Sequence, residues 1–176
     1  MMIRTAGLAA ALMLTACGQR GAAPADNAAV TEAPAAADKA AAAGPAEPSA
    51  SDRPVAIAAA AADLKWGGCP PGMPEGCQIA VLHGDPAKPD ADIFLKVPGG
   101  AAIPPHWHTA SERIMLVSGQ LEVQYKGSAP ATLTPGSYAY GPARLPHRGD
   151  CRSATPCILF IAFDLPVDRH DYAGTI

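Results

Sequence analysis

Short apolar or alternating runs, separated by turn residues, dominate the chain after Trp66. The runs cover residues 78–82, 93–97, 113–117, 121–125, 137–140 and 158–163. Pro and Gly lie between them, for example at Pro98-Gly99-Gly100. Strands at intervals of about 8–12 residues favour a sandwich or barrel, and neither a βαβ rhythm nor a helix-length period is visible. We therefore predict an all-β domain.

The part of the chain before Trp66 has a different composition. Residues 18–62 are mostly Ala, Pro, Gly, Ser, Asp and Glu, with no aromatic residue. Such a stretch buries too little apolar surface to offset its ordering entropy, so we predict a disordered tether over 17–62 and a folded domain over 63–176. Asp52 as a cap and Pro54 in a first turn also give residues 51–64 the signals of a short helix.

The N-terminus has the order of parts of an export signal. Arg4 precedes a short apolar stretch, and Leu14-Thr15-Ala16-Cys17 follows it. This order resembles the lipobox of bacterial lipoproteins. The resemblance implies a signal peptide over 1–16, a lipid on the sulfur of Cys17, and a location at the cell envelope, anchored on the periplasmic face of a membrane. The alternative is an ordinary signal peptide with an incidental cysteine.

Overall composition narrows the function classes. The 176 residues carry a formal net charge of −3, and no basic run or face is visible. We therefore expect no nucleic-acid partner. Much of the apolar content is alanine in the first third, so the core is expected to be small.

Four residues have the spacing and chemistry of a metal site. His106 and His108 alternate on an expected strand and so share one face, whereas Trp107 faces the opposite way. Glu112 lies at an even offset, and His147 follows a separate strand and turn. Three imidazoles and a carboxylate suit one divalent transition-metal ion, and Mn, Fe, Ni, Zn and Cu all remain open.

These residues lie in two spaced motifs. Gly-x5-His-x-His-x3-Glu-x6-Gly runs from Gly100 to Gly119, and Gly-x5-Pro-x4-His runs from Gly136 to His147. The chain thus resembles the cupin superfamily, most nearly its small single-domain bacterial members. The resemblance implies a double-stranded β-helix, or jelly-roll, barrel that binds one metal ion through His106, His108, Glu112 and His147. Small cupins often pair edge strands, so a homodimer is a further expectation.

Two positions depart from the second motif. Arg144 stands where the family usually has Gly, and Cys151 stands where an Asn is expected. Neither is a metal ligand in the family, so the predicted site is unaffected. A backbone that needs positive φ would be strained at Arg144.

Four cysteines follow Cys17, and export would permit disulfides between them. We predict the local pairs Cys69–Cys77 and Cys151–Cys157, because Gly or Pro in each loop helps it to turn back. Metal ligation by these thiols is the alternative, but the spacings differ from the usual C-x2-4-C.

Several other polar residues are weaker candidates. Four side chains could line a pocket, or could instead pack outward or be solvated. They are Arg113, Gln124, Tyr138 and Tyr140. Isolated histidines and acidic tails are usually solvated, so no role is expected for His83, His170, Asp164, Asp168 and Asp171.

The motifs support three functions. The first is a metal-dependent enzyme, oxygenase- or isomerase-like, acting on a small organic molecule at open positions on the ion. The second is a non-catalytic metal- or ligand-binding or sensing module at the cell envelope. The third is a structural lipoprotein with a vestigial site. The fold itself does not choose among them.

Overall fold

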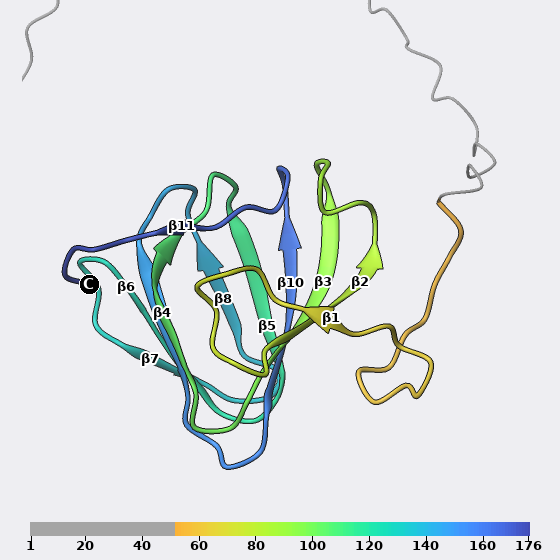
Figure 1. The fold of residues 1–176 in the computed structure, drawn as a ribbon, viewed down its shortest axis with the longest axis horizontal. Helices are drawn as coiled ribbons and strands as arrows, with labels where there is room; N and C mark the ends of the chain where they lie inside the picture. Colours follow the sequence, from red (N-terminus) through yellow and green to blue (C-terminus); the bar gives the residue numbers. More distant parts are fainter. Residues whose placement is uncertain (1–51) are drawn as a thin grey trace, which may run out of the picture. The chain divides into compact units, whose positions relative to one another are not determined.

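The computed structural model describes residues 52–176, and these form eleven β-strands and no helix (Figure 1). The strands are β1 (Gly67–Gly68), β2 (Gln78–His83), β3 (Ala91–Val97), β4 (Ala102–Trp107), β5 (Glu112–Ser118), β6 (Leu121–Tyr125), β7 (Ala131–Leu133), β8 (Tyr138–Gly141), β9 (His147–Cys151), β10 (Cys157–Phe163) and β11 (His170–Asp171). The all-β prediction is confirmed. No helix in residues 52–176 has the length and apolarity to cross a membrane.

The strands form two antiparallel sheets. Six strands pair in the order β1-β2-β3-β10-β5-β8, and five in the order β11-β4-β9-β6-β7. Every second residue of β10 is buried, from Cys157 to Phe163, which is the alternation expected where one face of a strand meets a core. Inward apolar side chains of both sheets form one hydrophobic core.

Glu112 is the exception to this apolar pattern. It is in phase with Ile114 and Leu116 on the inner face of β5 and is as buried as they are. A carboxylate at an inward core position costs desolvation free energy unless it meets a partner there, so this position indicates a functional site.

The segment after β10 returns across one end of the barrel (Figure 1). It pairs with β4 through β11, where His170 lies opposite Trp107 and Asp171 lies opposite His106. The rings of Trp107 and His170 stack with centroids 4.0 Å apart. Trp107 therefore packs against the C-terminal segment of its own chain.

The expected helix over residues 51–64 is absent from the described part of that stretch. Residues 52–66 contain no helix or strand, and turns lie at Ala59–Ala60 and Ala62–Asp63. The turns close through hydrogen bonds from Ala61 N to the Ala58 carbonyl and from Leu64 N to the Ala61 carbonyl. These i to i−3 contacts do not propagate, because a short helix without a packed apolar face is marginal in water. The predicted signal peptide and Cys17 lie outside the described residues.

Both predicted cysteine pairs are present. Cys69 bonds to Cys77 with Cα atoms 5.6 Å apart, and Cys151 bonds to Cys157 with Cα atoms 5.8 Å apart. The first closes a loop before β2, and the second joins the end of β9 to the start of β10 across the two sheets.

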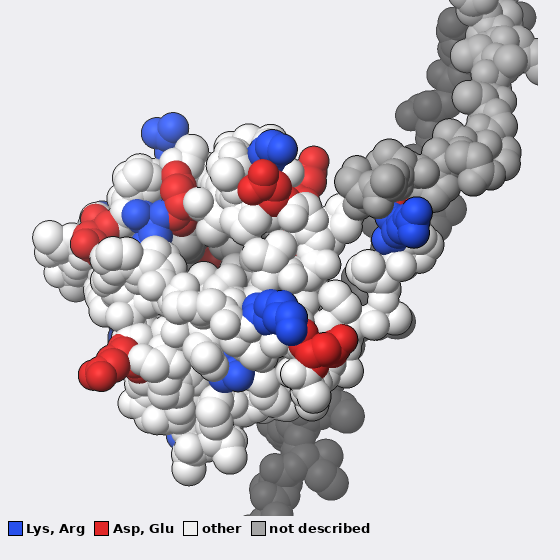
Figure 2. Space-filling model, turned by 45° about the vertical axis from the view of Figure 1, so that its right-hand side comes forward, with Lys and Arg blue, Asp and Glu red and all other residues white. Residues whose placement is uncertain are grey.

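Charged side chains of both signs lie beside one another on the face shown in Figure 2, without a block of one sign.

Candidate metal centre

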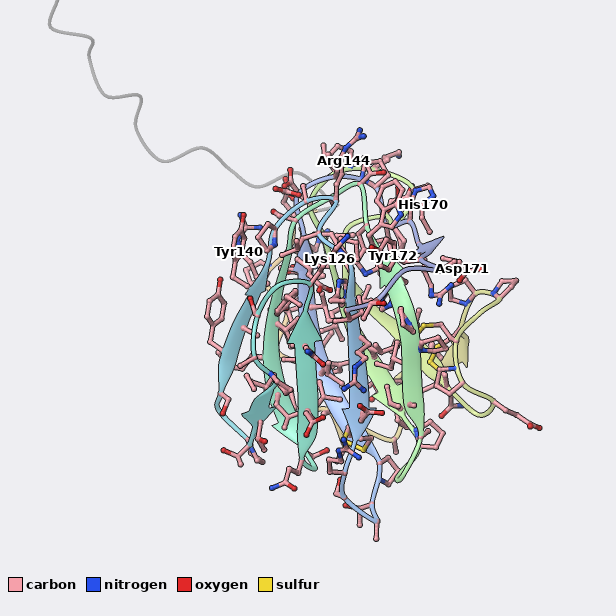
Figure 3. All side chains as sticks on the ribbon, turned by 90° about the vertical axis from the view of Figure 1, so that its left-hand side faces the viewer. Lys126, Tyr140, Arg144, His170, Asp171 and Tyr172 are labelled. Atoms are coloured by element: carbon pink, nitrogen blue, oxygen red, sulfur yellow. A yellow bond between two sulfur atoms is a disulfide. The ribbon has the colours of Figure 1, made fainter. Side chains whose placement is uncertain are left out.

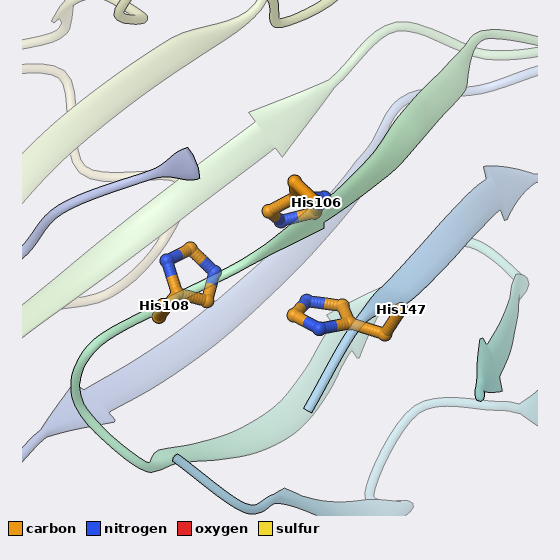
Figure 4. A group of neighbouring side chains, drawn as sticks. All are labelled: His106, His108 and His147. Carbon is orange, nitrogen blue, oxygen red and sulfur yellow. The ribbon is translucent and has the colours of Figure 1, made fainter. Parts of the chain in front are cut away.

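Three histidines from neighbouring strands converge at one end of the barrel (Figure 4). His106 in β4 and His147 at the start of β9 lie directly opposite each other across the sheet, and His108 follows the end of β4. One ring nitrogen of each lies within 4.8 Å of the others. His106 and His147 are buried, and the side chain of His108 is 11% exposed.

Glu112 reaches the same point from the other sheet. Its carboxylate lies 3.0 Å from Nε2 of His147 and 3.7 Å from Nε2 of His108. Gly141 faces it across β5 and β8, and a Cβ atom there would lie 2.6 Å from Oε1 of Glu112. The absent side chain at Gly141 therefore leaves the room that the carboxylate occupies. The structure thus brings together all four residues of the predicted metal site.

Each imidazole is fixed by a hydrogen bond from Nδ1 to a backbone carbonyl. The acceptors are Pro104 for His106 at 2.8 Å, Leu145 for His147 at 3.1 Å, and Asp168 for His108. A carbonyl oxygen only accepts, so Nδ1 carries the proton and Nε2 of each neutral ring presents a lone pair. This tautomer suits metal ligation through Nε2. In metal-binding histidines the other ring nitrogen usually donates a hydrogen bond, as Nδ1 does here.

Burial favours the neutral form of all three rings. It lowers the pKa of His106 to about 2, and it lowers the pKa of His108 and of His147 from the usual value. Burial has the opposite effect on the acid and raises the pKa of Glu112 to about 7. In both cases the low-dielectric surroundings disfavour the charged form.

Within residues 52–176, no lysine or arginine pairs with the Glu112 carboxylate. Oε1 of Glu112 is buried and makes no hydrogen bond within residues 52–176, although Nε2 of His147 is only 3.0 Å away. When Glu112 is ionised and Nδ1 of His147 holds the proton, both atoms at this short distance present lone pairs and no proton lies between them. A cation between Oε1 of Glu112 and Nε2 of His147 would accept the lone pairs of both atoms. The residues present therefore fit a divalent metal ion.

A cavity of about 420 Å³ opens from the centre into the barrel. Its wall is mostly aliphatic and combines both sheets with the C-terminal segment. The aliphatic residues from the strands are Ile79, Ile93, Leu95, Ile103, Ile114, Leu121, Val123, Leu159 and Ile161. This volume is in the range of sites for small organic ligands.

Sequence reasoning missed several residues of this site. Asp168, Arg169 and Asp171 line the cavity, and the hydroxyl of Tyr125, which lies opposite His147 in β6, is buried without a hydrogen-bond partner among the described residues. Burial raises the pKa of Tyr125, and the Glu112 carboxylate adds to that effect. The sequence signal for these residues was the charged run after β10, but a run of this kind is usually solvated.

The four weaker pocket candidates lie elsewhere. Arg113 alternates with Glu112 and faces outward, and its cross-strand partner Tyr140 is 49% exposed (Figure 3). Tyr138 is 57% exposed on the same outer face. The side-chain oxygen of Gln124 accepts a hydrogen bond from Nη2 of Arg148 at 3.0 Å. None of the four lines the cavity in the described part of the chain, because period-two alternation turns each away from it.

Residues 93–163 match the cupin-domain family. The fold is similar to that of the DMSP lyase DddQ from Ruegeria pomeroyi DSS-3, with a TM-score of 0.54, 21% identity and coverage of 64% of this chain and 64% of that one. It is also similar to the polyketide cyclase RemF from Streptomyces resistomycificus, with a TM-score of 0.54, 19% identity and coverage of 64% of this chain and 82% of that one. This chain thus spans less than two thirds of the length of DddQ. No curated protein matches the sequence.

Proposed function

We propose that the cupin domain of this chain binds one divalent transition-metal ion through His106, His108, Glu112 and His147. We further propose that the ion serves an enzyme, oxygenase- or isomerase-like, acting on a small organic molecule. The observation that carries the proposal is the meeting of unpartnered lone pairs from Glu112 and His147 at one end of the cavity.

The surroundings of the centre support catalysis. Four protein ligands leave one or two positions free on a five- or six-coordinate ion, and the bound ion would supply Lewis-acid or redox chemistry there. The aliphatic walls would exclude water around a bound molecule, which strengthens electrostatic interactions inside the cavity. The lyase and the cyclase of the same fold are enzymes, but that likeness extends to the fold alone.

A binding or sensing module is the second candidate. The observation that favours it is the composition of the cavity wall. Apart from the four proposed ligands, the charged residues on it are Arg148, Asp168, Arg169 and Asp171, and the side chain of Asp168 is already engaged by Thr109 and His170. A wall with few free acid or base groups suits holding a molecule at least as well as transforming it.

The N-terminal sequence supports a location for this domain. We propose that Cys17 carries a lipid and anchors the chain at the cell envelope, with the domain on the periplasmic side. Replacing Cys17 with Ser should move the chain from the membrane fraction to the soluble fraction and abolish incorporation of labelled palmitate. Retained labelling would overturn the proposed lipidation.

Elemental analysis of the purified full chain tests the metal site. We expect about one equivalent of a single transition metal, lost in His106→Ala and in Glu112→Ala but retained in His83→Ala, since His83 lies outside the site. Circular dichroism should show an unchanged β signal in all variants. Stoichiometric metal in the His106→Ala/Glu112→Ala double variant would show that the site is elsewhere. Oxygen uptake or turnover by the loaded chain would then separate the enzyme from the binding module.

A further inference from the structure

Arg169 is a buried arginine on the wall of the cavity. It directly precedes His170 and Asp171, the two labelled residues of β11 in Figure 3, in the segment that crosses one end of the barrel. Its side chain is 7% exposed, and it lines the same cavity as the four residues of the metal centre. A guanidinium remains charged at any pH a protein tolerates, so its burial calls for an anionic or hydrogen-bonding partner.

Its hydrogen bonds satisfy one side of the group. Nη1 donates to the carboxylate of Asp171, whereas Nε and Nη2 are buried with no partner in residues 52–176. The N–H groups of Nε and Nη2 lie on one edge of the guanidinium and point the same way. Through this edge a guanidinium can donate two parallel hydrogen bonds to one carboxylate.

The neighbouring loop holds the guanidinium in place. A Cβ atom at Gly72 would lie 2.3 Å from Nη1 of Arg169 and 3.2 Å from the carboxylate of Asp171. Gly72 lies within the loop that the Cys69–Cys77 disulfide closes, and Pro70, Pro71 and Met73 of that loop line the cavity. The absence of a side chain at Gly72 therefore lets the loop pack directly against the guanidinium of Arg169, whereas the side chain of Asp171 stays 81% exposed.

The position of the pair relative to the metal centre follows from the strand register. Asp171 lies opposite His106 across β11 and β4, and His106 lies opposite His147 across β4 and β9. Asp171, the partner of Arg169, is thus two strands away from His147, and the two residues align with His106 across β11, β4 and β9. The four proposed ligands and Arg169 line the same cavity, so one molecule bound there would lie near both.

We propose that Arg169 recognises the carboxylate of a small organic acid whose apolar body lies against the aliphatic wall of the cavity. The free edge of the guanidinium selects a planar oxyanion, and the cavity of about 420 Å³ limits its size. Two donor atoms that Asp171 does not use, Nε and Nη2, distinguish this assignment from a purely structural ion pair. The proposal names the substrate class for the proposed metal site, and so rests on that function, although Arg169 can be tested alone.

Binding of hexanoate and hexanamide to the full chain tests this assignment. The two probes share a body and differ in charge. By calorimetry or ligand-observed NMR, we expect the wild-type chain to bind hexanoate at least tenfold more tightly than hexanamide. Arg169→Gln should lose that preference, and Arg169→Lys should recover part of it, because an ammonium supplies charge without the two-pronged geometry. Arg152→Gln, at an arginine that is 50% exposed, is the matched control and should bind like the wild type.

Each titration is run on metal-free and on metal-loaded chain. Failure to load metal would overturn the proposed metal site, while an Arg169-dependent preference in the metal-free chain would still support the carboxylate site. Equal affinity for hexanoate and hexanamide in the wild type would overturn the carboxylate site. So would unchanged hexanoate binding in a folded Arg169→Gln variant that still binds one equivalent of metal.

Discussion

Nδ1 of His108 donates a hydrogen bond to the backbone carbonyl of Asp168, which is 60 residues further along the chain. The bond ties a proposed metal ligand to the C-terminal segment. The Asp168 side chain fixes the segment in turn, since it accepts hydrogen bonds from Thr109 N at 2.8 Å and from Nε2 of His170 at 3.0 Å. The orientation of His108 therefore depends on a segment outside the spaced motifs.

Replacing Asp168 with Ala should weaken metal binding. Loss of both side-chain hydrogen bonds frees the segment, so the carbonyl that orients His108 moves. We expect metal affinity to fall roughly 10- to 100-fold, the usual effect of losing a group that orients a ligand. Competition with a chelator measures the affinity. Asp168→Asn keeps an acceptor for Thr109 N and should recover most of it, whereas wild-type affinity in Asp168→Ala would contradict this role.

Replacing Gly141 with Ala should displace Glu112. The added Cβ would lie 2.6 Å from Oε1 and 2.7 Å from Cγ of Glu112, so the carboxylate must turn away. Metal affinity should fall by roughly tenfold or more while the strands remain paired. Gly68→Ala is the control, because nothing lies within 4 Å of a Cβ there. Equal losses in the two variants would show that space at Gly141 is unimportant for the site.

The contribution of Glu112 to the stability of the metal-free chain should fall as pH rises toward neutrality. Burial raises the pKa of Glu112 from 4.5 to about 7 in the folded chain. Because the pKa of Glu112 is higher in the folded chain than in the unfolded chain, protonation of Glu112 favours folding. This contribution to the free energy of unfolding is fully present below about pH 4.5 and is lost as pH rises through about 7. Glu112→Gln removes this loss, so at pH 8 the metal-free variant should be more stable than metal-free wild type by about 3 kcal/mol.

Urea unfolding at pH 4 and pH 8, in the presence of a chelator, measures the effect. The difference between Glu112→Gln and wild type should shrink toward zero at pH 4. Glu75→Gln, at an exposed glutamate, is the control and should follow the wild type at both values. A wild-type chain as stable as Glu112→Gln at pH 8 would contradict the raised pKa.

Replacing Arg144 with Gly should stabilise the fold. Arg144 has a φ of 62°, in the left-handed region that disfavours side chains, and its N–H donates to the carbonyl of His108 at 2.8 Å. Glycine relieves the strain and keeps that bond, at the cost of some chain entropy. We expect a net gain of about 0.5–1 kcal/mol in the free energy of unfolding.

Denaturant unfolding of Arg144→Gly beside Arg144→Ala checks the origin of the gain. Alanine removes the same side chain but keeps the strained backbone, so it should bring no gain. A stabilised alanine variant would attribute the effect to the arginine side chain and its charge instead.

The pattern of apolar residues was enough to predict β2, β3, β5, β6, β8 and β10, but not β1, β7 or β11, and the motifs predicted the spacing of the proposed ligands. Alternation depends on the two-residue period of a strand, so residues 113–117 and 158–163 were recognised within a residue or two of β5 and β10. The sequence marked Arg144 as a position where a positive φ would be strained, and the structure has a φ of 62° there. The paired cysteines followed from short loops that can turn back on themselves. The same alternation opposes Arg113 to Glu112, and so could have excluded Arg113 from the pocket.

The residues around the proposed ligands could be identified only from the folded chain. Period and spacing describe neighbours within one strand, whereas Asp168 and Arg169 reach the site because the segment after β10 folds back across the end of the barrel. A charged run of this kind is solvated when nothing covers it, and here the loop containing Gly72 covers Arg169. The distinction between a surface arginine and one that recognises a carboxylate is thus set by contacts between segments far apart in the sequence.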